Sequence, residues 1–560
     1  MSPAALTTEL RDAVAAWTTQ DPDPGTRAET ERLVRAADDG DEAAAAELAD
    51  AFSTRLAFGT AGLRGRLGPG PNRMNRVVVG QAAAGLARYL LDTGAAGGSV
   101  LVGHDARHGS AEFARDTCEI LTGAGFFALL TPGPVPTPVV AFGIRYLGCV
   151  AGVVVTASHN PPQDNGYKVY LDDGSQIVPP ADAEISVRID EVTRHDLADV
   201  PRSDGYEVLG PELLAGYRDR LVSLVPADAP RELAWVYTPL HGVGGSLVAE
   251  VVAKAGFAAP QVVASQAEPD PDFPTVAFPN PEEPGAIDAA IALAEQTGAD
   301  LVVANDPDAD RCAVAAPFPA ADGGSRWRML SGDELGALLG EDALRRGVQG
   351  TYACSVVSSS LLGVLAAAHG QPFTSTLTGF KWIGRVPGLA FGYEEAIGYC
   401  VDPAAVRDKD GVSALVRVLV LAAGLQAAGL TVADRLDEIA RSYGVFVTDQ
   451  LSVRVQDLRL IADAMARLRA HPPTTLAGED VEVTDLAPGS DALPPTDGVR
   501  LHTESSTVVV RPSGTEPKLK AYLEARVPLE RSAGLAADRQ RARQRLTDLR
   551  REVAAALGLD

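Results

Sequence analysis

Three aspartates at alternating positions form the sharpest cluster of charge in the sequence. Asp306, Asp308 and Asp310 lie within the segment NDPDADR, which directly follows the apolar run 301–304. Carboxylates this close together repel one another unless a cation lies between them. Oxygen ligands of this kind suit Mg²⁺, which also shares its coordination shell with phosphate groups. An EF-hand does not fit, because Arg311 stands where that loop needs its glycine. The motif predicts a divalent-cation site, with a solvated acidic turn as the alternative.

A serine follows a second apolar run. The run VAGVVV at 150–155 leads into TASHNPP, in which Ser158 is the third residue. A turn at the carboxyl end of a strand is where open α/β sheets bind ligands. Lys168 follows within NGYK, which we expect to be a loop that returns into a strand at 169–171. A serine can accept and return a phosphoryl group when a metal and a cation neutralise the charge. An ordinary solvated turn is the alternative.

Three further loops carry polar groups. The glycine-rich segment FGTAGLRG places Arg64 where it can hold an oxyanion, although a plain surface turn explains it equally well. In GYEEAIGY, Glu394 and Glu395 either accept hydrogen bonds from sugar hydroxyls or begin a helix. The segment RPSGTEPK follows the strand-like run 506–510 and has the composition of a phosphate cradle. Its polar members are Arg511, Ser513, Gly514, Thr515 and Lys518.

Lysine is rare in this chain. Of 49 basic residues only six are lysine, so a lysine here is more often present for its own compact, titratable ammonium group. Most of them lie in the motifs rich in Gly, Asn or Pro. They are Lys168, Lys254, Lys381, Lys409, Lys518 and Lys520.

Strands and helices must position these loops. From about residue 80 to 441, short apolar runs alternate with helical patterns, which predicts parallel βαβ units and doubly wound sheets. In the first such segment we expect helices at 80–91, 111–121 and 138–146 and strands at 100–103, 126–130 and 148–155. The tail has strands followed by an Arg-rich helix at 533–557, without this alternation, which favours an α+β domain.

A chain of 560 residues needs several domains. We predict α/β architecture, with three related mixed α/β domains and an α+β C-terminal domain. The regions are a helical extension at 1–50, a first domain with Ser158 at 51–215, a second with the aspartates at 216–325, a third with the glutamate loop at 326–442, and a fourth with the phosphate loop at 443–560.

Composition excludes several classes of partner. The net charge of −25 disfavours nucleic acid and anionic membranes, which require an extended basic face. Five widely spaced cysteines with no CxxC pair suggest neither disulfides nor a zinc site, so we expect a reduced, cytoplasmic setting. The first residues lack the pattern of a signal peptide, and the apolar window 412–430 reads as a buried helix.

Four of these motifs, in this order and spacing, resemble the α-D-phosphohexomutase superfamily: TASHNPP, DPDADR, GYEEAIGY and RPSGTEPK. This group contains phosphoglucomutases, phosphomannomutases and phosphopentomutases, and the resemblance extends over about residues 50 to 545. It implies a four-domain enzyme that interconverts hexose 1-phosphate and hexose 6-phosphate, of glucose, mannose or both. The reaction would pass through a phosphoserine and a bound sugar bisphosphate.

The resemblance also implies a role for each loop. Ser158, His159, Arg64 and Lys168 would be catalytic, and Ser158 would bind one Mg²⁺ together with Asp306, Asp308 and Asp310. The substrate would contact residues from four loops, namely Arg311, Lys381, Glu394, Glu395, Arg511, Ser513, Gly514, Thr515 and Lys518. The expected partner is a small phosphorylated sugar, the bisphosphate would act as activator and intermediate, and the chain would be a monomer or homodimer.

One loop departs from the hexose pattern of the superfamily. Many members read GExSG where this chain has an apolar Ile397, and Tyr399 stands where many have histidine. These changes, together with TGFKWIG and EPDPDFP, resemble the branch of phosphopentomutase-type and glucose-1,6-bisphosphate-forming members. A pentose 1-/5-phosphomutase, or a bisphosphate-forming enzyme, is therefore the alternative. A phosphatase and a non-catalytic sugar-phosphate sensor are less favoured, because the former leaves the phosphate cradle unexplained and the latter needs no Ser158.

Overall fold

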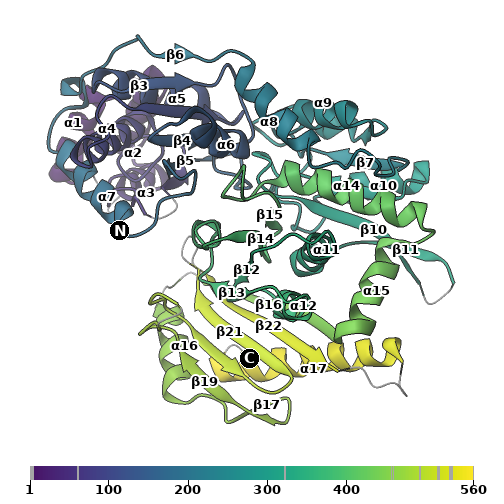
Figure 1. Cartoon of the computed structure of the whole chain (residues 1–560). Helices are drawn as coiled ribbons and strands as arrows, with labels where there is room; N and C mark the ends of the chain where they lie inside the picture. Colours follow the sequence, from purple (N-terminus) through teal and green to yellow (C-terminus); the bar gives the residue numbers. More distant parts are fainter. Residues whose placement is uncertain are drawn as a thin grey trace. The chain divides into compact units, whose positions relative to one another are not determined.

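The computed structural model consists of two compact units, shown in Figure 1. The first contains Met1–Val314 and Asp402–Val420, and the second contains Ala315–Val401 and Leu421–Asp560. The structure describes residues 6–59, 62–320, 323–455, 457, 459–490, 493–513, 518–528 and 534–558.

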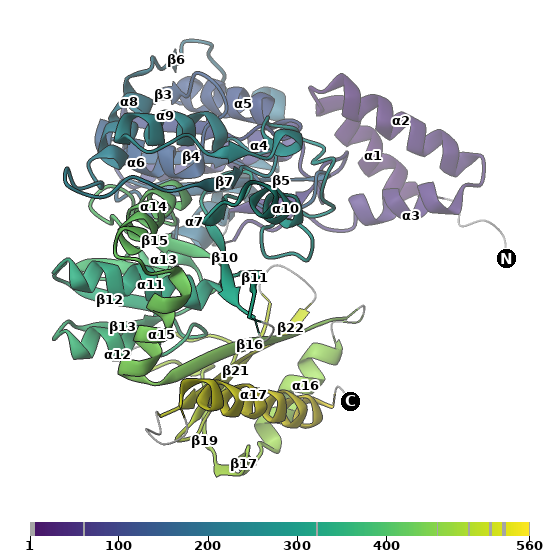
Figure 2. The same cartoon turned by 90° about the vertical axis from the view of Figure 1, so that its right-hand side faces the viewer.

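Three helices precede the first sheet, namely α1 (Thr8–Gln20), α2 (Pro24–Asp38) and α3 (Glu42–Ala51). Figure 2 shows them side by side as a separate bundle. They enclose a small core of their own that includes Leu33 and Leu48. The buried Arg73 guanidinium attaches the bundle to the domain that follows, at 2.9 Å from Glu47 and 2.5 Å from Asp50.

The largest sheet of the first unit has the strand order β1-β5-β4-β2-β3-β6. Strands β4, β2, β3 and β6 are parallel, whereas β5 is antiparallel to β4 and β1 is antiparallel to β5. The strands are β1 (Leu63–Arg66), β2 (Ser99–His104), β3 (Phe127–Leu130), β4 (Ala151–Val155), β5 (Asp164–Leu171) and β6 (Glu207–Val208).

Helices cover both faces of this sheet, as strand periodicity requires. Val100 and Val102 of β2 belong to the core shared with α4 (Arg76–Asp92), α5 (Ser110–Gly123) and α7 (Ala181–Val192). The intervening Leu101 packs on the other side, against Gly143 of α6 (Thr137–Leu147). A Cβ at position 143 would lie 2.5 Å from the Leu101 side chain, so only glycine fits there. Helix α8 (Glu212–Val222) packs against α6.

In the first unit, β7 (Trp235–Thr238) lies between β8 (Gln261–Val262) and β9 (Leu301–Ala304) and is parallel to both. The helices that alternate with these strands are α9 (Gly245–Ala255) and α10 (Asp288–Thr297). After β9 the chain continues into β10 (Ala313–Pro319), which pairs antiparallel with β11 (Ser325–Met329). Helix α14 (Gly411–Ala427) begins in the first unit and ends in the second.

The second unit contains a mixed sheet of order β13-β12-β14-β15. Strand β12 (Thr351–Ser355) is parallel to β13 (Phe373–Thr376) and β14 (Leu389–Glu394), and β15 (Gly398–Cys400) is antiparallel to β14. Its helices are α11 (Gly332–Arg345), α12 (Leu361–Ala368) and α13 (Phe380–Ile383), and α15 (Val432–Tyr443) follows later in the chain.

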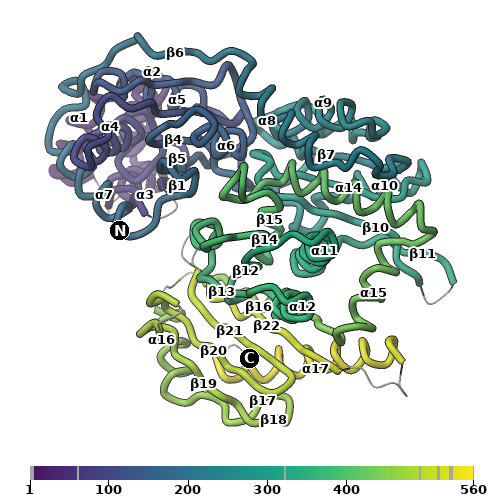
Figure 3. Tube along the Cα trace, in the orientation of Figure 1, coloured from purple at the N-terminus to yellow at the C-terminus, as the bar shows by residue number. Residues whose placement is uncertain are grey.

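The C-terminal sheet of the second unit is antiparallel, with order β16-β22-β21-β20-β19 (Figure 3). Helices α16 (Arg459–Ala470) and α17 (Leu535–Leu557) share one core with it. The strands are β16 (Val445–Arg454), β19 (Glu482–Asp485), β20 (Val499–His502), β21 (Ser506–Pro512) and β22 (Lys518–Val527), beside a hairpin of β17 (Thr475–Leu476) and β18 (Glu479–Asp480).

This architecture confirms the predicted class, α/β domains followed by an α+β domain. Two local predictions were wrong. The helix expected from residue 80 begins at Arg76, because the Asn75 side chain caps it by accepting the amide of Val78 at 3.0 Å. Lys168 lies within strand β5 rather than in a loop, opposite Val154. Gly166 permits that pairing, because a Cβ there would lie 2.6 Å from the carbonyl oxygen of Thr156.

No single helix among the described residues is long and apolar enough to cross a membrane. In the described part of the chain, one bent pair of helices, α14 and α15, meets the length and composition criterion together.

A buried carboxylate joins two parts of the second unit. Asp333, at the start of α11, is 9% exposed and accepts the amide of Ser359 at 2.7 Å and the hydroxyl of Tyr393 at 2.9 Å. Burial raises the pKa of Asp333 to about 7, since removal from water penalises the ionised form more than these hydrogen bonds favour it.

The raised pKa predicts a pH dependence of stability. An aspartate has a pKa of about 3.9 when unfolded, so the folded state holds the proton over a pH range in which the unfolded state has lost it. The stabilising contribution is complete below about pH 4 and is lost as the pH rises through about 7. The free energy of unfolding of the wild type relative to Asp333→Asn should therefore fall across this window by a few kcal/mol in order of magnitude. Urea unfolding of both proteins at several pH values measures it, and a constant difference would contradict the shifted pKa.

Candidate active site

The turn that carries Ser158 is held in an uncommon backbone conformation. Ser158 has φ of +54°, a region that non-glycine residues rarely adopt. Its amide donates to the Thr156 hydroxyl at 2.9 Å, and the residue is only 3% exposed. Its own hydroxyl donates to Oδ2 of Asp306 at 2.8 Å. The strained turn thus directs the serine oxygen to the aspartate cluster.

The Arg107 guanidinium fixes the carbonyl groups of this turn. It donates to the carbonyl oxygens of Ser158 at 2.6 Å, Asn160 at 2.5 Å and Pro161 at 2.8 Å. Asp105 forms an ion pair with the same side chain, and the distance from Arg107 Nε to Asp105 Oδ2 is 3.3 Å. Arg107 follows β2 and Ser158 follows β4, which are neighbouring parallel strands, so the sheet brings both turns to one edge.

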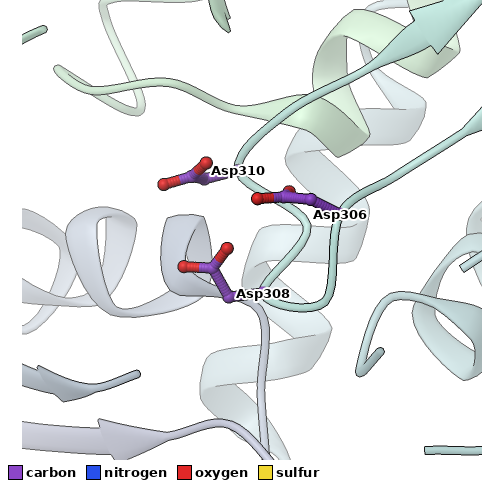
Figure 4. Close-up of side chains that lie close together, drawn as sticks. All are labelled: Asp306, Asp308 and Asp310. Atoms are coloured by element: carbon purple, nitrogen blue, oxygen red, sulfur yellow. The ribbon is translucent and has the colours of Figure 1, made fainter. Parts of the chain in front are cut away.

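The three aspartates converge at the end of β9 (Figure 4). They are fully buried, and one ligand oxygen from each lies within 4.8 Å of the others. Ala309, with φ of +53°, turns the loop so that Asp308 and Asp310 point to the same side as Asp306. The loop is tied to the start of helix α6 by Thr137, whose hydroxyl donates to Oδ2 of Asp308 at 2.6 Å.

Two lysines balance part of this negative charge. The Lys168 ammonium lies 2.7 Å from Asp308 and 2.8 Å from Asp310. The Lys409 ammonium lies 3.4 Å from Asp310 and 3.8 Å from Asp408. Burial lowers the pKa of Lys168, but Asp308 and Asp310 outweigh it, and the pKa is raised overall. Lys168 is therefore an ammonium ion at neutral pH.

The same charges shift the pKa values of Asp306 and Asp310 in opposite directions. Burial raises the pKa of Asp310, yet Lys168 and Lys409 more than compensate and keep it below its ordinary value. Among the described residues no lysine pairs with Asp306, and burial followed by repulsion from Asp308 and Asp310 raises its pKa well above the ordinary value. The cluster is thus incompletely neutralised by the side chains around it.

These residues fit a divalent cation. Oδ1 of Asp308 and Oδ1 of Asp310 are buried and accept no hydrogen bond from the described residues. Uncompensated carboxylate oxygens of this kind are costly unless a cation coordinates them. The donor set is all oxygen, which suits a hard ion such as Mg²⁺. The three aspartates and the nearby Ser158 oxygen would hold it.

The structure brings the other predicted residues of the first unit to the same place. Arg64 on β1 donates to the Asn160 side chain at 3.2 Å. Nδ1 of His159 lies 3.3 Å from the Ser158 hydroxyl oxygen. Burial, together with the charges of Arg311 and Arg64, lowers the pKa of His159 well below its ordinary value, so its imidazole is neutral. Arg311 Nε lies 3.8 Å from Asp310 and 3.9 Å from Asp306.

In the second unit the predicted sugar loop follows β14. Glu394 ends the strand, and the carboxylate of Glu395 accepts hydrogen bonds from the hydroxyls of Ser355 at 2.9 Å and Ser358 at 3.1 Å. Ile397 in the same loop is 1% exposed. Lys381 lies on α13, with its ammonium 5.9 Å from the centre of the Trp382 ring.

The predicted phosphate loop connects β21 to β22. Arg511 lies on β21 opposite Lys520. The Ser513 amide donates to the carbonyl oxygen of Lys518 at 2.8 Å, which closes the base of the loop. Gly514 and Thr515 lie outside the described residues.

Sequence reasoning missed two residues of the first unit's cluster, Lys409 and Arg107. Lys409 is one of only six lysines and is flanked by two aspartates, Asp408 and Asp410. Their carboxylates accept the hydroxyls of Tyr170 at 2.8 Å and Tyr217 at 2.7 Å, which positions the loop. Arg107 follows a strand directly, as Ser158 does, but a single arginine in a turn is too common a pattern to single out.

Comparison with known proteins shows which family this chain resembles. Four models of the phosphoglucomutase/phosphomannomutase family match in order along the chain. They are alpha/beta/alpha domain I at residues 55–196, domain II at 215–317, domain III at 331–443 and the C-terminal domain at 451–542. A Haemophilus influenzae protein named "Probable phosphomannomutase" is 48% identical over 459 residues, covering 81% of this chain and 93% of that protein.

The chain belongs to the phosphoglucomutase/phosphomannomutase family. A Schizosaccharomyces pombe member named "Probable phosphoribomutase" is 37% identical over 571 residues, covering 92% of this chain and 94% of that protein. The crystal structure of a family protein from Burkholderia thailandensis has the same fold, with a TM-score of 0.69 at 22% identity over 90% of this chain and 98% of that chain. The chain is therefore a phosphomutase of the α-D-phosphohexomutase superfamily, an isomerase that transfers phosphate intramolecularly.

The Arg107 contacts generate a prediction for this phosphomutase. In Arg107→Lys the charge beside Asp105 remains, but an ammonium cannot reach all the carbonyl groups that the planar guanidinium bridges. The Ser158 turn should relax, and kcat/KM should fall about 10- to 100-fold, as misplacement of a reacting atom by about 1 Å does.

The matched control is Arg115→Lys, at an exposed position on α5 that pairs with Glu112. Steady-state kinetics and thermal unfolding of both variants measure the effect. Full activity in Arg107→Lys would show that the turn keeps its shape without these hydrogen bonds.

Proposed function

We propose that this phosphomutase interconverts hexose 1-phosphate and hexose 6-phosphate, of glucose, mannose or both, with Ser158 as the phosphoryl carrier. The observation that carries the proposal is the 2.8 Å hydrogen bond between the Ser158 hydroxyl and Asp306, within a buried cluster of carboxylates and lysines. A serine exposed on a plain turn would need none of these partners.

The cluster supplies the charge balance that phosphoryl transfer requires. Mg²⁺ bound by Asp306, Asp308, Asp310 and the Ser158 oxygen would neutralise the negative charge on the transferring phosphoryl group. Lys168 remains an ammonium ion at 2.7 Å from Asp308, so it acts as a fixed positive charge and hydrogen-bond donor and not as a base. Arg64, which contacts the Ser158 turn through Asn160, adds a second fixed cation.

Each transfer exchanges a phosphoryl group for a proton. A sugar hydroxyl oxygen forms a bond to phosphorus, the bond from phosphorus to the Ser158 oxygen breaks, and the hydroxyl proton ends on that serine oxygen. The product is a sugar bisphosphate held on the enzyme. In the second transfer the other phosphoryl group returns to Ser158, the proton returns to the sugar, and the released sugar carries its phosphate at the other end.

The second unit offers groups for the rest of the substrate. Glu395 is oriented by two serine hydroxyls and can accept hydrogen bonds from sugar hydroxyls. Lys381, Glu394, Arg511, Ser513 and Lys518 belong to the sugar and phosphate loops proposed to complete the binding site, together with Gly514 and Thr515.

A pentose 1-/5-phosphomutase is the second candidate, and two observations favour it. A relative that matches almost the whole chain is named for ribose. Ile397 is buried in the glutamate loop, where it contributes no hydroxyl to a hexose ring. The relative named for mannose has the higher identity, 48% against 37%, which supports the hexose assignment.

Replacement of the carrier tests the mechanism. Intact-mass analysis of the active wild type should show one added phosphoryl group after incubation with a sugar bisphosphate, and Ser158→Ala should show none. Turnover of Ser158→Ala should fall by about 10⁴-fold or more, because no other hydroxyl occupies that position.

Ser175→Ala, at another buried serine of the first unit, controls for the loss of a hydroxyl. Full turnover in Ser158→Ala would rule out the phosphoserine. Release of inorganic phosphate at the rate of isomerisation would instead support a phosphatase.

A panel of substrates tests the choice of sugar. Glucose, mannose and ribose 1-phosphates are supplied separately with Mg²⁺ and a trace of the corresponding bisphosphate. The hexose assignment predicts that kcat/KM for glucose or mannose 1-phosphate exceeds that for ribose 1-phosphate by at least about tenfold, the worth of one well-made hydrogen bond to a charged group. The reverse order would assign the enzyme to pentose phosphates.

A further inference from the structure

Three consecutive serines, Ser358–Ser360, form a turn between β12 and α12 in the second unit, called here the serine turn. Its first member contacts the glutamate loop. The Ser358 hydroxyl donates to Oε2 of Glu395 at 3.1 Å and accepts the amide of Glu395 at 3.1 Å. Ser355 adds a second hydroxyl to the same carboxylate oxygen at 2.9 Å. One end of the turn therefore fixes both the backbone and the side chain of Glu395.

The other two members bind a carboxylate from the C-terminal sheet. Glu524 on β22 is 6% exposed. It accepts the Ser359 hydroxyl at 2.6 Å, the Ser360 amide at 2.8 Å and the Ser360 hydroxyl at 2.7 Å. Hydrogen bonds to an ionised acceptor are about twice as strong as neutral ones. Glu524 thus caps the start of α12 with three charge-assisted bonds.

Strand β22 also carries the phosphate loop. It begins at Lys518, the last residue of RPSGTEPK, and runs without interruption to Glu524 and beyond. Tyr522 lies two residues before Glu524, on the same face of the sheet. Burial raises the pKa of the Tyr522 hydroxyl above its ordinary value, and the charge of Glu395 adds to that rise. The strand therefore links the base of the phosphate loop to the serine turn.

Hydrogen bonds, more than close packing, set the position of the turn. A cavity of about 190 Å³ borders Ser358, Ser359 and Ser360 on the side of β20 to β22. Side chains beside a cavity lack the dense packing that fixes rotamers elsewhere in a core. Asp333 supplies a further restraint, by accepting the Ser359 amide at 2.7 Å.

We propose that the serine turn is a positioning device that holds the sugar-binding carboxylate of Glu395 at a fixed place relative to the phosphate loop. The inference rests on the proposed role of Glu395 and goes beyond it, because Ser358 and Glu524 are assigned as positioning residues. Neither needs to touch the sugar. Their effect on turnover passes through Glu395.

A double-mutant cycle tests this dependence. Ser358→Ala should lower kcat/KM about tenfold, chiefly through KM, because Glu395 loses a hydrogen bond that orients its charge. In the background of Glu395→Gln, which itself lowers kcat/KM, the further cost of Ser358→Ala should shrink to less than about twofold. Glu524→Gln should behave in the same way with a smaller cost. Ser358→Thr, which keeps the hydroxyl, should restore most of the activity.

The matched control is Ser375→Ala, at a serine that borders the same cavity and makes no hydrogen bond to Glu395 or Glu524 in the described part of the chain. It should leave kinetics and thermal unfolding unchanged. Equal costs of Ser358→Ala in the two backgrounds, or no cost in either, would overturn the inference while leaving the mutase intact. If Glu395→Gln has no effect on active enzyme, the sugar-binding role fails and the inference fails with it.

Discussion

The site of the first unit depends on one electrostatic constraint, the burial of three carboxylates within 4.8 Å of one another. Such a cluster folds only if positive charge is brought to it from elsewhere in the chain. Lys168 comes from β5 of the first sheet, and Lys409 comes from the segment just before α14. Elements that are distant in sequence are thus tied to one loop by the charge that the loop carries.

The same constraint explains the unusual backbone around the cluster. Ser158 and Ala309 both have positive φ. The first turn directs the Ser158 hydroxyl to Asp306, and the second lies in the loop on which the three aspartates converge. Such turns leave carbonyl groups without strand or helix partners, and buried carbonyl groups must be satisfied. Arg107 satisfies three of them with one guanidinium. The backbone at Gly411 also packs closely against the end of the aspartate loop. A Cβ on Gly411 would lie 2.1 Å from the carbonyl oxygen of Arg311, so the position requires glycine.

Residues with local chemical signatures could be predicted from the sequence, and residues that act through tertiary contacts could not. The alternation of the aspartates and the position of Ser158 after an apolar run are visible along the chain, as are the parallel strands that present them. Lys168 was expected in a loop, because Asn and Gly usually mark turns. Here Asn165 is buried and donates to the Ser110 hydroxyl at 3.0 Å, so tertiary contacts override the local signal. The serine turn was missed for a related reason, since its partner Glu524 lies 164 residues away from Ser360.

In the proposed mechanism the two units carry different chemical tasks. Ser158, the aspartates and the two lysines belong to the first unit, while the glutamate loop and the strands that flank the phosphate loop belong to the second. A mutase of the proposed kind must present both ends of one substrate to the same serine, so its chemical groups stay fixed while its recognition groups accept two orientations of the sugar. If Glu395 binds the sugar as proposed, the hydroxyls of Ser355 and Ser358 hold its carboxylate in one place, and the carboxylate can accept hydrogen bonds from whichever sugar hydroxyls face it. A carboxylate locked in an ion pair with arginine would favour a single orientation. In the proposed mechanism, hydroxyl partners suit a carboxylate that must accept the sugar in both orientations.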